Sequence, residues 1–129
     1  MPKFGQKSLA RLKTCDKRLR DICNELIKET DFTVLCGFRN EAEQTDAYNS
    51  GNSKAKWKQS PHNYSPSLAI DIAPYPIDWN DTARFDELAI RFKRVADELA
   101  IDIEWGGDFK SIVDKPHWEI KNWKDDVRD

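Results

Sequence analysis

The chain contains two histidines, His62 and His117, and each has an acidic residue nearby. Asp71 follows His62 by nine positions and lies within the otherwise apolar run 68–73. Burying an unpaired carboxylate there would be costly, so Asp71 needs a partner. A divalent metal ion shared by His62, Asp71 and His117 would supply one and would leave a fourth tetrahedral position for water, as in catalytic zinc sites. The alternative is that both histidines are ordinary surface or core residues and that Asp71 caps a turn.

A second cluster of ionisable residues, Asp-Lys-Pro-His-Trp-Glu, spans positions 114–119. Pro116 favours extended geometry in the residue before it, and in the strand expected to follow, His117 and Glu119 point to the same face. If His117 binds a metal ion, Asp114 is close enough in the chain to act as a general base on water, because zinc lowers the pKa of bound water toward about 7. Glu119 is the alternative, as the base or as a residue that orients a ligand.

Further side chains are candidates for lining the same site. Arg39, at the end of a predicted strand, suits a carboxylate or a developing oxyanion, although a structural ion pair would use the same residue. Gln44, one turn beyond a helix cap, could hydrogen-bond into the cleft or lie on a solvated helix face. Trp105, Trp118 and Trp123 are expected to line the cleft or the core rather than to bind a cofactor.

Hydrophobic periodicity and cap residues predict the elements that position these side chains. Helices are expected at 8–29, from an Asn40 cap to near Gly51, and at 82–100 after an Asp81 cap. Strands are expected at 32–38, 68–73, 101–105 and 117–120, with a polar loop at 52–66 and a turn at 106–108. This order predicts a single α+β domain over residues 1–129, in which helices pack against a small, mostly antiparallel sheet.

Length, charge and hydropathy narrow the classes of protein. The chain has 129 residues, 39% of them hydrophobic, which is enough for one domain. Its 21 basic and 23 acidic residues give a net charge of −2, so no global field holds a polyanion. No apolar run is long enough to span a membrane. Basic residues crowd the N-terminal segment, where a solvated helix face is favoured over binding to nucleic acid or an anionic wall polymer.

The N-terminal segment and the cysteines indicate the compartment. Residues 1–21 are basic but lack the apolar stretch and cleavage site of a signal peptide, so the chain is expected to be kept in a cytoplasm. The three cysteines show no CxxC spacing that would indicate a zinc ribbon or a redox pair. Reduced cysteines in the core are expected.

Four sequence elements resemble a known family of zinc peptidases. The segments SPHNYSPSLAIDIAPYPIDW at 60–79 and DKPHWE at 114–119 are similar to the two metal motifs of the D-alanyl-D-alanine carboxypeptidase and L-alanyl-D-glutamate endopeptidase family. GFRNEAEQ at 37–44 is similar to the family's Gly-aromatic-Arg and Gln element, and WGGD at 105–108 to its Trp-Gly-Gly-Asp turn. These zinc peptidases act on peptidoglycan and include phage endolysins.

The resemblance implies a role for each matched residue. His62, Asp71 and His117 match the ligands of one Zn²⁺ ion, and Asp114 matches the catalytic general base. Arg39 matches the arginine that steadies the substrate or the tetrahedral intermediate. The resemblance also implies a small α+β fold with the zinc site in a cleft, similar to the D-Ala-D-Ala peptidase and hedgehog structures.

The loop after His62 departs from the common family pattern. It is longer, lacks the family's glycine and reads Asn-Tyr-Ser-Pro-Ser at 63–67. The pocket wall is therefore expected to differ. The substrate-binding candidates are Arg39, Gln44, Tyr64, Ser67, Trp105 and Trp118.

The resemblance leaves three functions open. The run Ile-Asp-Trp at 77–79 is similar to the endopeptidase group, which favours cleavage between L-alanine and D-glutamate of the stem peptide over removal of a terminal D-alanine. A non-catalytic zinc-containing module that binds the wall or a partner is the third, and retention of Asp114 argues against it. The expected protein is a monomer that stays in the host cytoplasm until its release to the cell wall, with peptidoglycan as partner rather than nucleic acid or a membrane. Two histidines and an aspartate would also accept cobalt or manganese.

Overall fold

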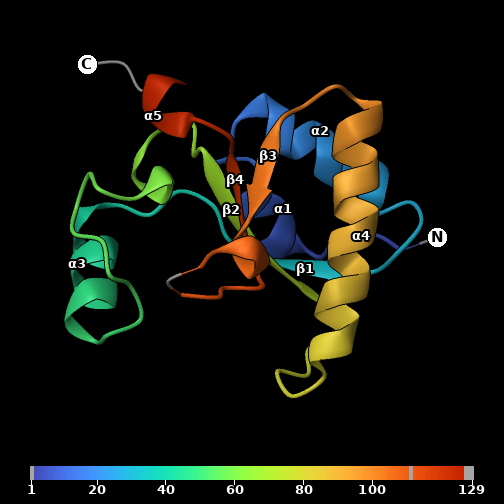
Figure 1. The fold of residues 1–129 in the computed structure, drawn as a ribbon, viewed down its shortest axis with the longest axis horizontal. Coiled ribbons are helices and arrows are strands. Elements are labelled where there is room, and N and C mark those ends of the chain that lie inside the picture. The colour runs from blue at the N-terminus through green and yellow to red at the C-terminus, as the bar shows by residue number, and fades with distance from the viewer. Residues whose placement is uncertain (1, 111, 127–129) are drawn as a thin grey trace.

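The computed structural model describes residues 2–110 and 112–126, which form an α+β fold around one antiparallel sheet (Figure 1). The sheet order is β1-β2-β4-β3. The α+β class and the antiparallel sheet predicted above are confirmed. In chain order the elements are α1 (Gln6–Leu12), α2 (Lys17–Leu26), β1 (Phe32–Cys36), α3 (Glu41–Asn49), the 3-10 helix η1 (Pro61–Asn63), β2 (Ala69–Pro74), α4 (Thr82–Glu98), β3 (Ile103–Trp105), the 3-10 helix η2 (Gly106–Asp108), β4 (His117–Ile120) and α5 (Trp123–Asp126).

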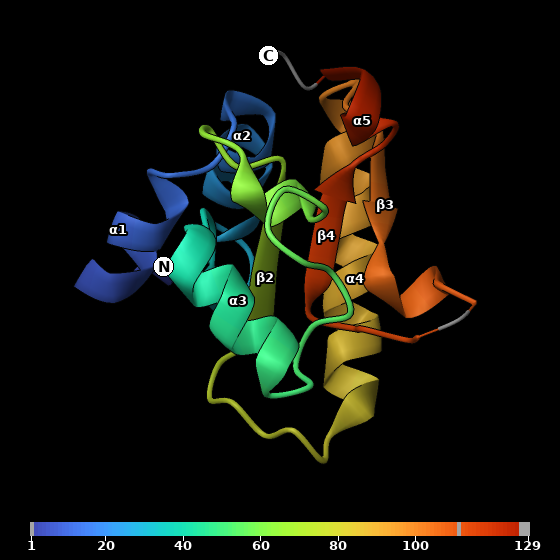
Figure 2. The ribbon, with the colours of Figure 1, turned by 90° about the vertical axis from the view of Figure 1, so that its left-hand side faces the viewer.

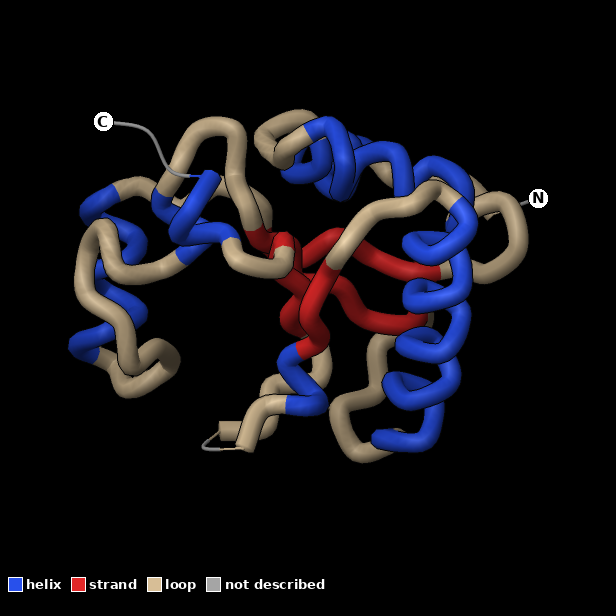
Figure 3. Tube along the Cα trace, turned by 45° about the horizontal axis from the view of Figure 1, so that its top comes forward, coloured by secondary structure: helices blue, strands red, loops and turns tan. Residues whose placement is uncertain are grey.

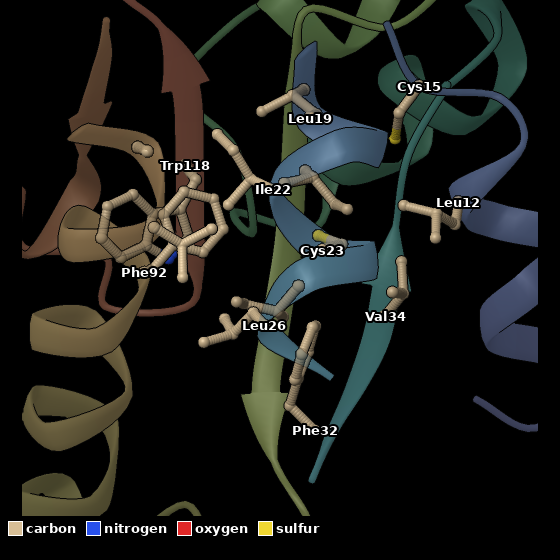
Figure 4. Packing of buried hydrophobic residues seen from close by; sticks show 14 of the residues in the cluster. Leu12, Cys15, Leu19, Ile22, Cys23, Leu26, Phe32, Val34, Phe92 and Trp118 are labelled. Carbon is tan, nitrogen blue, oxygen red and sulfur yellow. The ribbon is translucent and has the colours of Figure 1, made fainter. Parts of the chain in front are cut away.

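One face of the sheet packs against α2 and α4 and forms the hydrophobic core. Phe92 of α4 stacks on Trp118 of β4 with ring centroids 3.9 Å apart, and the apolar side of α2 lies beside this pair (Figure 4). Ile70 and Ile72 of β2 are also fully buried in this core. Because side chains alternate along a strand, burying these residues places Asp71 and the β4 residues on either side of Trp118 on the opposite face.

The opposite face of the sheet is only partly covered. Helix α3 and the loop that follows it lie across the sheet from α4 (Figures 1 and 2). The four-stranded sheet lies between α3 and α4 (Figure 3). Segments that carry the predicted site therefore meet on the face away from the core. Within the described part of the chain, no helix has the length and apolar character needed to cross a membrane.

The prediction of one continuous helix over 8–29 is wrong, because the chain breaks between α1 and α2. At the break, Asp16 N–H donates to Ser67 O (2.9 Å) and Ser67 N–H donates to Thr14 O (2.8 Å). The Asp16 carboxylate then accepts from Arg18 N–H (2.9 Å) and caps α2. The apolar stripe continues through the break, so periodicity alone predicts one helix. In the structure, Ser67 of the loop before β2 bonds to the chain between two separate helices.

Gly37 permits this break. A Cβ atom at Gly37 would lie 2.6 Å from Arg11 O and 2.3 Å from Thr14 Oγ1. The residue after β1 therefore packs directly on the turn after α1. The other predicted elements agree with the structure within a few residues at their ends, except that η1, η2 and α5 were not predicted as helices. All three cysteines are free, with Cys15 and Cys23 in the core and Cys36 half-buried.

Candidate active site

The three predicted metal ligands converge on the open face of the sheet. His62 Nε2 lies 3.3 Å from His117 Nδ1 and 3.3 Å from Asp71 Oδ1, and His117 Nδ1 lies 3.1 Å from Asp71 Oδ1. In a tetrahedral zinc site with metal–ligand distances of about 2.0–2.1 Å, neighbouring ligand atoms are about 3.3 Å apart. The three donor atoms thus already form one face of such a tetrahedron.

The hydrogen bonds of the two imidazoles fix which nitrogen faces the centre. His62 Nδ1 lies 2.7 Å from Gly37 O, and His117 Nε2 lies 2.7 Å from Glu119 Oε1. A carbonyl or carboxylate oxygen only accepts, so these two nitrogens carry the N–H groups and the other two present lone pairs. Two lone pairs and the Asp71 carboxylate that point at one another are stabilised by a proton or a metal ion between them, so the donor set fits a metal ion.

Strand register and a capped turn bring the ligands together. Asp71 of β2 pairs directly with His117 of β4, which places both side chains on the same face. His62 lies on η1, where Ser60 Oγ accepts from His62 N–H (3.2 Å) and the Asn63 carboxamide oxygen accepts from Ser60 N–H (3.2 Å). His62 O in turn accepts from Arg39 N–H (2.7 Å), which ties η1 to the end of β1.

The electrostatics of the centre favour positive charge. Burial by itself would lower the pKa of His62, but the Asp71 carboxylate and Cys36 together outweigh burial and raise the pKa to about 10. Burial likewise opposes the charged form of His117, and Asp71 and Glu119 raise its pKa. The two histidines outweigh the burial of Asp71 and hold the pKa of its carboxyl well below the ordinary range. Protons and a metal ion therefore compete for the same nitrogen atoms.

Asp114 lies at the edge of this centre, on the segment between η2 and β4. One carboxylate oxygen of Asp114 lies within 4.8 Å of the donor atoms of Asp71 and His117. Asp114 is exposed, but the partial desolvation of its carboxyl beside the cluster and the charge of Asp71 raise its pKa. Its backbone is held by Gly106, whose carbonyl accepts from Asp114 N–H (2.9 Å) and where a Cβ atom would lie 2.1 Å from Asp114 O. A carboxylate with a raised pKa beside a metal centre is suited to general-base chemistry.

Arg39 also reaches the centre, as predicted. Its Nη2 atom lies 3.8 Å from Asp71 Oδ2, and its side chain is 18% exposed. Two neighbours were not predicted. Cys36 pairs with Asp71 in the β1–β2 register and places Sγ 3.9 Å from His62 Nδ1, and the Phe109 ring lies 5.8 Å from the His117 ring. The pairing of Cys36 depends on a register shift in β1, and Phe109 on the path of a loop, so the sequence held no signal for either.

Burial corrects three of the predicted substrate contacts. Gln44 and Ser67 are fully buried and Trp118 is 1% exposed, so direct contact with a substrate is wrong for these three. Ser67 Oγ hydrogen-bonds within its own turn, donating to Ala69 O (2.7 Å). Trp118 lies in the core because its strand neighbours occupy the opposite face.

The structure does not bring Trp105 and Tyr64 to the metal ligands. Trp105 pairs with Trp118 and stacks on it at 5.7 Å, and its indole N–H donates to Lys115 O (2.8 Å). Tyr64 donates its hydroxyl to Lys58 O (2.8 Å), and its ring lies 6.0 Å from that of Trp123. A role for these two side chains in substrate binding stays a prediction.

Comparison with known proteins gives relatives of one kind. The L-alanyl-D-glutamate peptidase of Escherichia phage T5 is 32% identical over 124 residues, which cover 92% of this chain and 89% of that protein. The peptidoglycan L-alanyl-D-glutamate endopeptidase CwlK of Bacillus subtilis (strain 168) is 32% identical over 110 residues, which cover 72% of this chain and 62% of CwlK.

A solved structure shares the fold. The crystal structure of the Serratia marcescens L-Ala D-Glu endopeptidase ChiX superimposes with a TM-score of 0.82, covering 97% of this chain and 95% of ChiX at 23% identity. The sequence model of phage L-alanyl-D-glutamate peptidases matches residues 1–126. The chain therefore belongs to the phage L-alanyl-D-glutamate peptidase family.

Proposed function

We propose that this protein is a zinc-dependent endopeptidase that hydrolyses the bond between L-alanine and D-glutamate in the stem peptide of bacterial peptidoglycan. The observation that carries the proposal is the triangle of donor atoms from His62, Asp71 and His117, with Asp114 at its edge. Both relatives are L-alanyl-D-glutamate peptidases, which supports the choice of bond.

The proposed reaction divides between the metal ion and the carboxylate. When bound, zinc supplies a Lewis acid that polarises the scissile carbonyl group and lowers the pKa of water. Asp114 accepts the proton of the attacking water and returns it to the nitrogen of the leaving D-glutamate. The position of Asp114 suits both steps, because its carboxylate lies within 4.8 Å of the donor atoms of Asp71 and His117.

Arg39 supplies positive charge beside the reacting group. Its guanidinium lies near Asp71 and is partly open to solvent. In the proposed reaction it donates hydrogen bonds to the developing oxyanion or binds a free carboxylate of the stem peptide. Stem peptides contain D-residues and free carboxylates, so one arginine beside one metal ion matches the charge of this substrate.

We also infer that the protein acts as a monomer on peptidoglycan, after release from the host cytoplasm, and needs neither nucleic acid nor a membrane. The support for a monomer is that all three metal ligands, the proposed base and Arg39 come from one chain. Zinc is favoured as the native metal because two histidines and one carboxylate suit a tetrahedral catalytic site.

Mass spectrometry of defined muropeptides tests the function directly. Zinc-loaded protein is expected to release fragments that begin with D-glutamate, and chelator-treated protein is expected to release none. Loss of the terminal D-alanine would instead identify a carboxypeptidase. If protein shown to hold one equivalent of zinc cleaves neither bond, the non-catalytic zinc module replaces the peptidase.

A further inference from the structure

Helix α3 is attached to the rest of the protein through a polar side chain. Gln44 is the one residue of α3 that is buried, with no exposed surface. Surface helices usually dock through an apolar stripe, which α3 does not present. The burial of Gln44 therefore needs another explanation than packing.

Every hydrogen-bonding position of the Gln44 carboxamide is used. Its Oε1 atom accepts from Arg39 Nη1 (2.9 Å) and from Asn63 Nδ2 (2.9 Å). Its Nε2 atom donates to Ser53 Oγ (3.0 Å) and to Ala55 O (2.6 Å). A carboxamide has two acceptor and two donor positions, so these four bonds fix its orientation and direct the oxygen at the guanidinium.

The same oxygen links Arg39 to the segment that carries a metal ligand. Asn63, the second donor to Gln44 Oε1, directly follows His62 and also donates to Arg39 O (3.2 Å). The Arg39 N–H donates to His62 O (2.7 Å). Gln44 therefore ties the guanidinium to the Asn63 side chain of η1, the 3-10 helix that carries His62.

Without Gln44, little else would hold the Arg39 side chain. Its other contacts within the described chain are longer, at 3.8 Å from Nη2 to Asp71 Oδ2 and 3.9 Å from Nη2 to Cys36 Sγ. Neither distance is that of a strong hydrogen bond. An arginine that acts on a transition state is most effective when its donors are oriented before the reaction.

We propose that Gln44 is a positioning residue, which holds Nη1 of Arg39 so that the remaining N–H groups of the guanidinium face the substrate beside the metal centre. The proposal rests on the proposed function for its catalytic consequence. It replaces the direct substrate contact predicted for Gln44, since a fully buried carboxamide acts through Arg39.

Kinetics of four variants test the proposal. Gln44→Met removes both acceptor positions and is expected to lower kcat/KM for muropeptide cleavage at least about tenfold. If Arg39→Ala acts mainly on kcat, Gln44→Met is expected to act mainly on kcat as well, and the same holds for KM. The double variant is expected to be no slower than Arg39→Ala alone. Gln44→Glu keeps the acceptors toward Arg39 and Asn63 but sets a carboxylate oxygen against Ala55 O, so it is expected to be more active than Gln44→Met and less active than the wild type. Effects that multiply in the double variant would overturn the proposal.

Asn40→Ala is the matched control for loosening of α3. The Asn40 side chain accepts from Glu43 N–H (2.9 Å) and caps α3 without touching the guanidinium. This variant is expected to lower Tm while kcat and KM stay unchanged. If it reproduces the kinetic change of Gln44→Met, Gln44 only stabilises the helix and the proposal is wrong.

A measurement independent of activity separates this proposal from the proposed function. In NMR spectra of arginine-¹⁵N protein, a hydrogen-bonded guanidinium rotates slowly and gives resolved Nη signals, which Arg39→Lys would identify by their loss. Gln44→Met is expected to merge the Arg39 signals. If the signals merge in Gln44→Met but the wild type cleaves no muropeptide, Gln44 positions Arg39 and the proposed peptidase activity is wrong. If the signals are unchanged in Gln44→Met, Gln44 does not position Arg39, whatever the activity of the wild type.

Discussion

Asp71 on β2 lies directly opposite His117 on β4, and its Oδ1 atom is 3.1 Å from Nδ1 of that histidine. The pairing makes the proposed metal centre part of the sheet. His62 joins it from a turn that is 55 positions away from His117 in the chain. Replacing Asp71 or His117 is therefore expected to lower metal affinity more than it lowers the stability of the fold.

The role of Asp114 is tested by Asp114→Asn. This change keeps the size of the side chain and removes the base, so cleavage of muropeptides is expected to fall by about 10²- to 10⁴-fold. Zinc content, measured by elemental analysis of the purified protein, is expected to stay at that of the wild type. Retained activity would show that another group, with Glu119 as the first candidate, accepts the proton.

Glu119→Gln tests the hydrogen bond behind His117. The Glu119 carboxylate fixes the tautomer in which Nδ1 of His117 faces the centre. A glutamine can present its amide group to Nε2 and loses the negative charge, so zinc affinity is expected to fall about 10- to 100-fold. Competition with a chromophoric chelator measures this affinity. Glu104→Gln, at the exposed residue paired with Glu119 in β3, is the control and should bind zinc as the wild type does.

Asp16→Asn tests the cap of α2 as a function of pH. Burial alone would raise the pKa of Asp16, but its bonds with Arg18 outweigh burial and hold the pKa below the ordinary value. A lowered pKa in the folded state stabilises the fold above the unfolded pKa of about 3.9, and the contribution is lost as the pH falls through the folded pKa.

Asparagine retains the capping oxygen of Asp16 and removes its charge. The wild type is therefore expected to be more stable than Asp16→Asn at pH 7, by about 0.2–1 kcal/mol, and the difference is expected to shrink below about pH 4. Urea unfolding at a series of pH values measures it. A difference that stays constant down to pH 3 would contradict the pairing of Asp16 with Arg18.

Gly37→Ala tests the close contact between β1 and the turn after α1. The new Cβ would meet the backbone oxygen of Arg11 at 2.6 Å, which only a backbone shift can relieve. The free energy of unfolding is expected to fall by about 1–3 kcal/mol. A Cβ atom at Gly5 would have no neighbouring atom within 4 Å, so Gly5→Ala serves as the control. Equal stability of the two variants would mean that the turn after α1 yields easily.

That His62, Asp71 and His117 meet could be predicted from the sequence, for reasons that the structure makes clear. A chain with two histidines offers few ligand sets, and an aspartate inside an apolar strand must have a partner. His117 and Glu119 were placed on one face by the alternation of a strand, and the structure has them so. These inferences needed only local geometry.

Predictions that depended on distant contacts were less successful. The break between α1 and α2 is created by the loop at Ser67, which no local pattern reveals. Gln44 was expected either in the cleft or on a solvated face, because a buried polar residue on a polar helix has no periodic signal. Its position becomes clear only when Ser53, Ala55 and Asn63 are seen around it.

The alternation of side chains along the four residues of β4 determines both the packing of the core and the position of His117. Trp118 fills the core between His117 and Glu119, which lie on the other face. An insertion or deletion of one residue in this strand would exchange the two faces, exposing the indole and burying the imidazole. A change in the length of β4 that no bulge absorbs would therefore damage the core and the proposed metal centre together.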